Sequence, residues 1–281
     1  MRIARLIALI YFGSFIVITS FQTRIIFPGQ ATQGQDDAQV RPRAGTELVR
    51  LESRRGEPIV ALSGPALTPD GRPHPDADGR PTLIYFYGNA MCLNDATGHF
   101  ERFRRLGLNV IIPDYLGYGM SGGSASERGC QATSEAVYDY LIATRGIEPS
   151  HIVAAGWSLG GAVAVDLASR KAVAGLIIFS AFTSGVDMGR RLMPFFPVSL
   201  LLRHRFDSLH KIQQIKCPIL IGHGRRDRIV PLDMGQRLAN AAKSPVTRLW
   251  IDEADHNDFY LVGDDRINEA ITKFISAVTS G

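Results

Sequence analysis

The sequence has no long run of basic residues, although its formal net charge is +4. Its positive residues are scattered, and adjacent arginines occur only as short pairs such as Arg54-Arg55 and Arg190-Arg191. Proteins that bind nucleic acids usually gather positive charge into a patch or stripe. Nucleic-acid binding is therefore not expected for this chain.

Cysteine is scarce as well. The 281 residues include three cysteines, Cys92, Cys130 and Cys217, with no Cys-x-x-Cys spacing. Three cysteines cannot all pair within one chain, so neither a disulfide framework nor a cysteine-based metal cluster is expected. Internal repeats are also absent. Hydrophobic residues make up 45% of the chain and charged residues 21%, which is the balance of an ordinary globular enzyme with an ample core.

One long stretch of the chain lacks charge altogether. From Leu6 to Thr23 the sequence has 18 uncharged residues, preceded by Arg2 and Arg5. This length exceeds the roughly 7–15 residues of a signal-peptide core and reaches the lower end of the roughly 17–25 residues that cross a bilayer. The preceding arginines favour a cytoplasmic N-terminus. We therefore predict that 1–28 is a membrane anchor with the domain outside the cytoplasm. A cleaved export signal, which would give a secreted or periplasmic protein, is the alternative.

The remainder divides into a linker and one domain. Residues 29–45 are polar and rich in Gln and Gly, which predicts a linker. Within 46–281, apolar runs alternate with helix-like stretches, a pattern typical of parallel strands covered by helices on both faces. The predicted fold class is α/β, with a mostly parallel central sheet flanked by helices. We expect strands at 47–51, 58–62, 82–87, 109–113, 151–156, 175–180, 218–223 and 247–251, and helices at 97–106, 134–144, 159–169, 234–242 and 265–278.

A single hydroxyl stands between glycines where one of these strands meets a helix. In Gly156-Trp157-Ser158-Leu159-Gly160, a sharp turn would push the Ser158 side chain clear of the sheet, and small neighbours would relieve crowding. The free N–H groups at the start of the helix would suit a developing oxyanion. These features predict a nucleophile. A serine that merely caps the helix is the alternative.

A nucleophilic serine needs a base and an orienting acid. Of the seven histidines, His256 directly follows the last predicted strand, at its carboxyl end. Asp227 lies in the turn after the strand that ends near His223. Ser158, Asp227 and His256 therefore follow the chain order Ser…Asp…His, each at the carboxyl end of a strand, where sites form in open α/β sheets.

With these residues in place, the sequence resembles the α/β-hydrolase fold. The segments "GWSLGG", "HGRRDRIVP" and "DHND" carry this resemblance. The insert with "PFFPVSLLLRHRFDSLHKI", together with "YGNAMCLND" and "DYLGYGMSGG", makes the chain resemble more narrowly the BEM46 / ABHD12–13–17 type of serine hydrolase. The resemblance implies an oxyanion hole formed by the backbone N–H groups of Asn89 and Leu159. The chain departs from the family pattern at Tyr87, where a His is usual, and at Leu116, where an Arg is common.

Residues 183–215 interrupt the alternation of strands and helices. This segment is far longer than most connections and is rich in Leu, Phe, Met and Pro. It follows the strand "GLIIFS", so it leaves the sheet at the end where Ser158 lies. We predict a helical lid insert over the site, with Leu192, Phe195 and Phe196 in an apolar substrate pocket. Packing within the core and contact with a membrane are the alternatives for such side chains.

The sequence thus predicts a serine hydrolase that cleaves carboxylic esters or thioesters of a small acyl or lipid-like substrate. Ser158 attacks the carbonyl, His256 takes the proton, and Asp227 orients His256. This chemistry needs no metal and no organic cofactor. A serine peptidase of the same fold and a non-catalytic ligand-binding protein are the alternatives. The expected partners are the substrate and, through the N-terminal segment, a membrane; the oligomeric state is left open.

Overall fold

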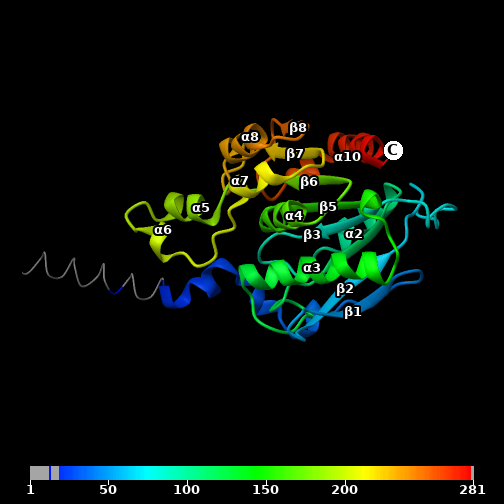
Figure 1. The fold of residues 1–281 in the computed structure, drawn as a ribbon, viewed down its shortest axis with the longest axis horizontal. Helices are drawn as coiled ribbons and strands as arrows, with labels where there is room; N and C mark the ends of the chain where they lie inside the picture. Colours follow the sequence, from blue (N-terminus) through cyan, green and yellow to red (C-terminus); the bar gives the residue numbers. More distant parts are fainter. Residues whose placement is uncertain (1–12, 14–18, 280–281) are drawn as a thin grey trace, which may run out of the picture.

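The computed structural model describes residue 13 and residues 19–279. It contains an eight-stranded sheet in the order β1-β2-β4-β3-β5-β6-β7-β8 (Figure 1). β1 pairs with β2 and β2 with β4 in antiparallel fashion, whereas every pairing from β4 to β8 is parallel. The strands are β1 Glu47–Glu52, β2 Pro58–Gly64, β3 Thr82–Phe86, β4 Asn109–Pro113, β5 Ile152–Trp157, β6 Gly175–Phe179, β7 Ile219–Gly224 and β8 Val246–Ile251. The predicted α/β class is confirmed.

Helices flank this sheet on both faces, which accounts for the continuous apolar sequences of its central strands. All residues of β3, β6 and β7 are buried, because helices cover both faces of the sheet (Figure 1). The longer helices are α2 Thr97–Arg105, α3 Glu127–Ala143, α4 Leu159–Arg170, α8 Leu232–Ala241 and α10 Asp264–Thr279, with the short α9 Phe259–Val262 before α10. Four of the five predicted helices thus agree with the structure to within two residues at each end.

The exception is α3, which begins at Glu127 rather than at Ser134. Ser126 caps this helix, and its hydroxyl accepts a hydrogen bond from the N–H of Gly129 at 2.9 Å. Glu127 then places negative charge in the first turn, where the helix dipole favours it. The prediction rested on apolar periodicity, which begins about two turns after this cap. The predicted helix therefore lacked its first two turns.

The segment 183–215 is an insert between β6 and β7. Its helices are α5 Gly185–Leu192, α6 Val198–Leu201 and α7 Ser208–Lys211, followed by the 3-10 turn η4 Ile212–Gln214. α5 and α6 project beyond the sheet, whereas α7 lies back against the domain (Figure 1). The insert is helical, as expected.

Most of the predicted anchor, Leu6–Thr23, lies outside the described residues. Within residues 13 and 19–279, the structure has no helix that is both long and apolar enough to cross a bilayer. Residues 19–26 are helical.

The chain after this helix does not stand away from the domain. Phe27 is fully buried, and so is Ala38 in the 3-10 turn η2 Asp36–Ala38. Gln33 follows η1 Pro28–Thr32, and its side chain donates a hydrogen bond to the carbonyl of Ser121 at 3.0 Å. At least the first part of the expected linker 29–45 therefore packs on the domain.

Candidate active site

Ser158 lies at the turn between β5 and α4. Its φ of +55° falls in the left-handed region that non-glycine residues rarely adopt. The Ser158 side chain makes no capping hydrogen bond to α4, so the helix-cap alternative is excluded. A strained residue whose hydroxyl stands at the carboxyl end of a strand and does not cap the following helix has the geometry of a nucleophile elbow.

Two glycines allow this turn. A β-carbon on Gly156 would lie 2.1 Å from the carbonyl oxygen of Gly160, and one on Gly160 would lie 1.9 Å from that of Phe86. Both contacts are with backbone, which cannot rotate away. The second contact also shows that the first turn of α4 presses against the end of β3, where the loop beginning at Tyr87 starts.

Three loops bring the predicted triad together. The His256 Nε2 lies 3.0 Å from the Ser158 Oγ, and the His256 Nδ1 lies 2.8 Å from the Asp227 Oδ2. Ser158 follows β5, Asp227 follows β7 and His256 follows β8, so all three stand at the carboxyl edge of the sheet. His256 and Asp227 are buried, whereas Ser158 is partly exposed. The Ser158 hydroxyl is therefore reachable from solvent, whereas the predicted base and acid are shielded from water.

Asp227 is held in its charged form. Burial alone would raise its pKa, but hydrogen bonds from His223 and His256, the charge of His256 and the N–H of Val230 outweigh burial. Together they hold the pKa of Asp227 well below its usual range. Its carboxylate therefore remains an acceptor for His256 throughout the neutral pH range.

Comparison with known proteins identifies the family. Residues 79–210 match the model of the alpha/beta hydrolase family. The uncharacterized protein Rv2307c of Mycobacterium tuberculosis is 31% identical over 274 residues, which cover 98% of this chain and 94% of that protein. The human alpha/beta hydrolase domain-containing protein 17B is 32% identical over 198 residues, which cover 69% of this chain and 66% of the human protein. The chain belongs to the alpha/beta hydrolase family.

A solved structure agrees with this assignment. The esterase Pf2001 of Pyrococcus furiosus superimposes on this hydrolase with a TM-score of 0.66 at 20% identity, covering 83% of this chain and 92% of the esterase. At this identity the likeness shows the shared fold. It confirms the fold class that the sequence predicted.

A second histidine, His223, lies beside Asp227 in this hydrolase. The sequence alone had indicated no role for it. His223 is fully buried in β7, with its Nε2 at 2.8 Å from the Val230 carbonyl oxygen and 3.3 Å from the Asp227 Oδ2. Both neighbours are acceptors, so Nε2 carries the proton. The Nδ1 has no hydrogen-bond partner among the described residues. The spacing His-x-x-x-Asp places the two residues close in the sequence, but it does not by itself indicate this contact.

Tyr87, the departure from the family pattern, is part of a buried network. Its hydroxyl donates to the Asp114 Oδ1 at 2.8 Å, and its carbonyl accepts from the Tyr115 hydroxyl at 2.8 Å. Asp114 also accepts from the N–H groups of Leu93 and Met120. Burial raises the pKa of Asp114 to about 6 in spite of these donors, and it raises the pKa of Tyr87 well above its usual value. The network ties both ends of the loop 87–93 to the domain.

The two residues predicted to form the oxyanion hole border this loop. Leu159 is the first residue of α4, so its N–H has no partner within the helix. Asn89 is held by its side chain, which donates to the carbonyl of Ile26 and accepts from the Tyr118 hydroxyl at 2.9 Å. The side chain of Asn89 thus fixes the position of the residue, and the backbone N–H is the group that could donate to an oxyanion. Their role stays a prediction.

The predicted pocket residues do not form an enclosed pocket. Leu192 is 73% exposed and Phe195 86% exposed, and Phe196 is partly exposed. The apolar composition of the insert indicated burial against a substrate. The structure instead shows α5 and α6 projecting beyond the sheet, with Leu192 and Phe195 open to solvent (Figure 1). Their place in a substrate pocket stays a prediction.

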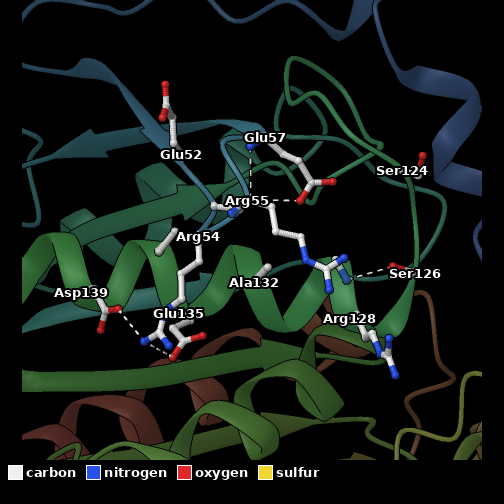
Figure 2. Close-up of a pocket in the computed structure, with 13 residues that line it drawn as sticks. Glu52, Arg54, Arg55, Glu57, Ser124, Ser126, Arg128, Ala132, Glu135 and Asp139 are labelled. Carbon is white, nitrogen blue, oxygen red and sulfur yellow. Dashed lines mark hydrogen bonds and ion pairs between the residues drawn. The ribbon is translucent and has the colours of Figure 1, made fainter.

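A pocket of about 320 Å³ lies elsewhere, between the β1–β2 turn and α3 (Figure 2). Figure 2 shows Arg54 reaching from the turn to Glu135 and Asp139 of α3, with which it forms ion pairs at 2.8 and 3.6 Å. None of the triad residues lines this pocket. These ion pairs of Arg54 hold the turn against the helix.

Proposed function

We propose that this hydrolase cleaves carboxylic ester or thioester bonds through an acyl-enzyme at Ser158. His256 takes the proton of the Ser158 hydroxyl as the oxygen attacks the substrate carbonyl. The N–H groups of Asn89 and Leu159 stabilise the negative charge on the carbonyl oxygen. His256 then returns the proton to the leaving alcohol or thiol. Water attacks the acyl-enzyme in the second half-reaction, again with His256 as the base.

The observation that carries this proposal is the continuous chain of contacts from the Ser158 Oγ through His256 to Asp227. Each link is within hydrogen-bond distance, and each residue comes from a different strand end. Asp227 stays ionised and stabilises His256 when it becomes charged. A binding protein without catalysis would gain nothing from this alignment.

Labelling with a fluorophosphonate tests the proposal. The Ser158 oxygen is expected to displace fluoride and form a stable phosphonyl ester, because His256 activates the hydroxyl. The label should be found by mass spectrometry on the peptide that contains Ser158, and Ser158→Ala should take up none. Equal labelling of Ser158→Ala, or no labelling of the wild type, would reject the nucleophile and favour the non-catalytic alternative.

The substrate class needs a second measurement. Comparing kcat/KM for p-nitrophenyl esters, acyl thioesters and peptide anilides separates the proposed function from a serine peptidase, which uses the same triad. We expect hydrolysis of esters or thioesters and no hydrolysis of peptide anilides. Cleavage of the anilides would favour the peptidase, since a serine peptidase also hydrolyses activated esters.

His223 enters the mechanism as a positioning residue. Its Nε2–H contacts the Asp227 oxygen that faces His256, whereas the N–H groups of Ile229 and Val230 hold the other oxygen. Loss of His223 should therefore weaken the hold on the oxygen that orients His256. A hydrogen bond to a charged group is worth about 1.5–3 kcal/mol. We expect His223→Leu to lower kcat about 10–100-fold with little change in KM. His223→Gln, which keeps a donor near the same place, should recover most of this loss.

A purely structural role for His223 predicts another pattern. In that case both variants would lose thermal stability in parallel with activity, and Gln would restore neither. Measuring kcat, KM and the unfolding temperature of both variants distinguishes the two roles.

The location of the protein stays a prediction. An anchor at Leu6–Thr23 that holds the domain outside the cytoplasm is supported by the uncharged length and the preceding arginines.

A further inference from the structure

One end of the molecule carries an unusual set of exposed apolar side chains. They lie on the helix 19–26 and on the insert, which adjoin one another at the end of the molecule away from β8 and α10 (Figure 1). We call this set the basic apolar face; its apolar members are Phe21, Ile25, Leu192, Phe195 and Leu200. They are five of the eight large hydrophobic side chains that are exposed among the described residues. Such a concentration usually marks a binding surface.

The helix and the insert are joined by specific contacts. Gln22 is buried between them: its amide donates to the Leu201 carbonyl at 3.2 Å and its oxygen accepts from the Arg203 N–H at 2.8 Å. The Thr23 hydroxyl lies 3.1 Å from the His204 Nε2. Gln22 and Thr23 both face the insert, whereas Phe21 and Ile25, one turn apart, are 48% and 61% exposed on the outer side of the helix. These hydrogen bonds fix the helix against the insert, so the exposed apolar side chains form one continuous surface.

The charge of this face has one dominant sign. Residues 19–27 and 183–206 together contain five arginines against a single acidic residue, Asp187. Asp187 is already used, since it forms ion pairs with Arg190 at 3.9 Å and with Arg237 at 3.1 Å. Arg24 lies 6.0 Å from the centre of the Phe21 ring, so cationic and apolar groups are interleaved. The arginines are Arg24, Arg190, Arg191, Arg203 and Arg205.

We propose that the basic apolar face docks on a lipid bilayer that contains anionic lipids. Apolar side chains would enter the boundary between head groups and acyl chains, and the arginines would pair with lipid phosphates. The chain leading into the face is uncharged from Leu6 to Thr23, which suits the same surroundings. A second copy of this face fits poorly, because it would bring five arginines against five others.

Docking has a consequence for the site. The helix 19–26 ends at Ile26, whose carbonyl accepts the side-chain hydrogen bond of Asn89. The docking face and the loop that holds the predicted oxyanion residue are therefore neighbours. A substrate drawn from the bilayer would approach the hydrolase from the side on which this loop lies.

An environment-sensitive fluorophore tests the proposal in the full chain. Cys92 and Cys130 are buried, so Cys217→Ser gives a background with little labelling, to which Leu200→Cys is added. Leu261→Cys in α9 is the matched control, since Leu261 is 81% and Leu200 83% exposed. With vesicles of phosphatidylcholine and phosphatidylglycerol, we expect a blue shift and a several-fold rise in emission of an NBD label at position 200 and none at 261.

The charge contribution is tested in the same assay. Arg24→Gln combined with Arg191→Gln should weaken docking about 30-fold, and phosphatidylcholine alone should support little of it. If the NBD label at position 200 emitted no more strongly than the label at position 261 when the protein is bound to vesicles, the proposal would be overturned. A blue shift at 200 that grows with protein concentration without vesicles, which indicates self-association, would overturn it as well. Ser158→Ala should dock normally, so the outcome is independent of the proposed hydrolysis.

Discussion

Ser158→Ala is expected to reduce kcat/KM for ester hydrolysis about 10⁶-fold without unfolding the protein. The hydroxyl makes no capping bond and its contact is with His256, so its removal deletes the nucleophile and little else. His256→Ala should cost about as much, and Asp227→Asn roughly 10⁴-fold, because the three groups act as a unit. Any double variant should be about as inactive as Ser158→Ala alone.

The control for this result is Ser150→Ala. Ser150 is an exposed serine that precedes β5, at the opposite end of the same strand from Ser158. Its loss should change neither activity nor the unfolding temperature. Circular dichroism and steady-state kinetics on both variants decide the matter, and near-wild-type activity of Ser158→Ala would remove the serine mechanism.

The second large effect is expected from Gly160→Ala. The added methyl group would lie 1.9 Å from the Phe86 carbonyl oxygen and 2.6 Å from that of Tyr87, and relief requires α4 to move away from β3. Such a shift displaces Leu159 and Ser158 relative to Asn89. We expect a loss of at least about 3 kcal/mol in the free energy of unfolding and at least a hundredfold loss of kcat.

Gly98→Ala is the matched control for this substitution. Gly98 lies in α2 with nothing within 4 Å of an added β-carbon. Alanine there should stabilise the protein by about 0.4–1 kcal/mol and leave kcat unchanged. Denaturant unfolding and kinetics of both variants provide the test, and a Gly160→Ala enzyme as stable and active as Gly98→Ala would show that the elbow tolerates a larger residue.

Residues that act through their place on a strand could be predicted from the sequence. Ser158, Asp227 and His256 each follow an apolar run, and parallel strands place their carboxyl ends at one edge whatever the details of packing. Their meeting at hydrogen-bond distances was therefore predictable from order and spacing. The contact of His223 with Asp227 was not, because it depends on how the turn 224–230 folds back on the end of β7.

The positions of the apolar side chains of the insert, by contrast, could not be predicted from the sequence. Hydrophobicity indicates that Leu192 and Phe195 seek contact with something apolar, but it does not say which surface supplies that contact. The end of α6 is held by contacts between segments far apart in the chain, those of Gln22 with Leu201 and Arg203. No local pattern encodes those pairings.

The sequence by itself determined the α/β class, the order of the strands along the chain and the three residues of the proposed triad. Local periodicity and turn chemistry decide these features, and they act over a few residues. Only the tertiary structure decided how Tyr87 ties its loop to Asp114, how His223 supports Asp227, and that the apolar insert faces outward beside the N-terminal helix. These features rest on contacts between distant segments, whose free energies depend on which surfaces the folded chain brings together.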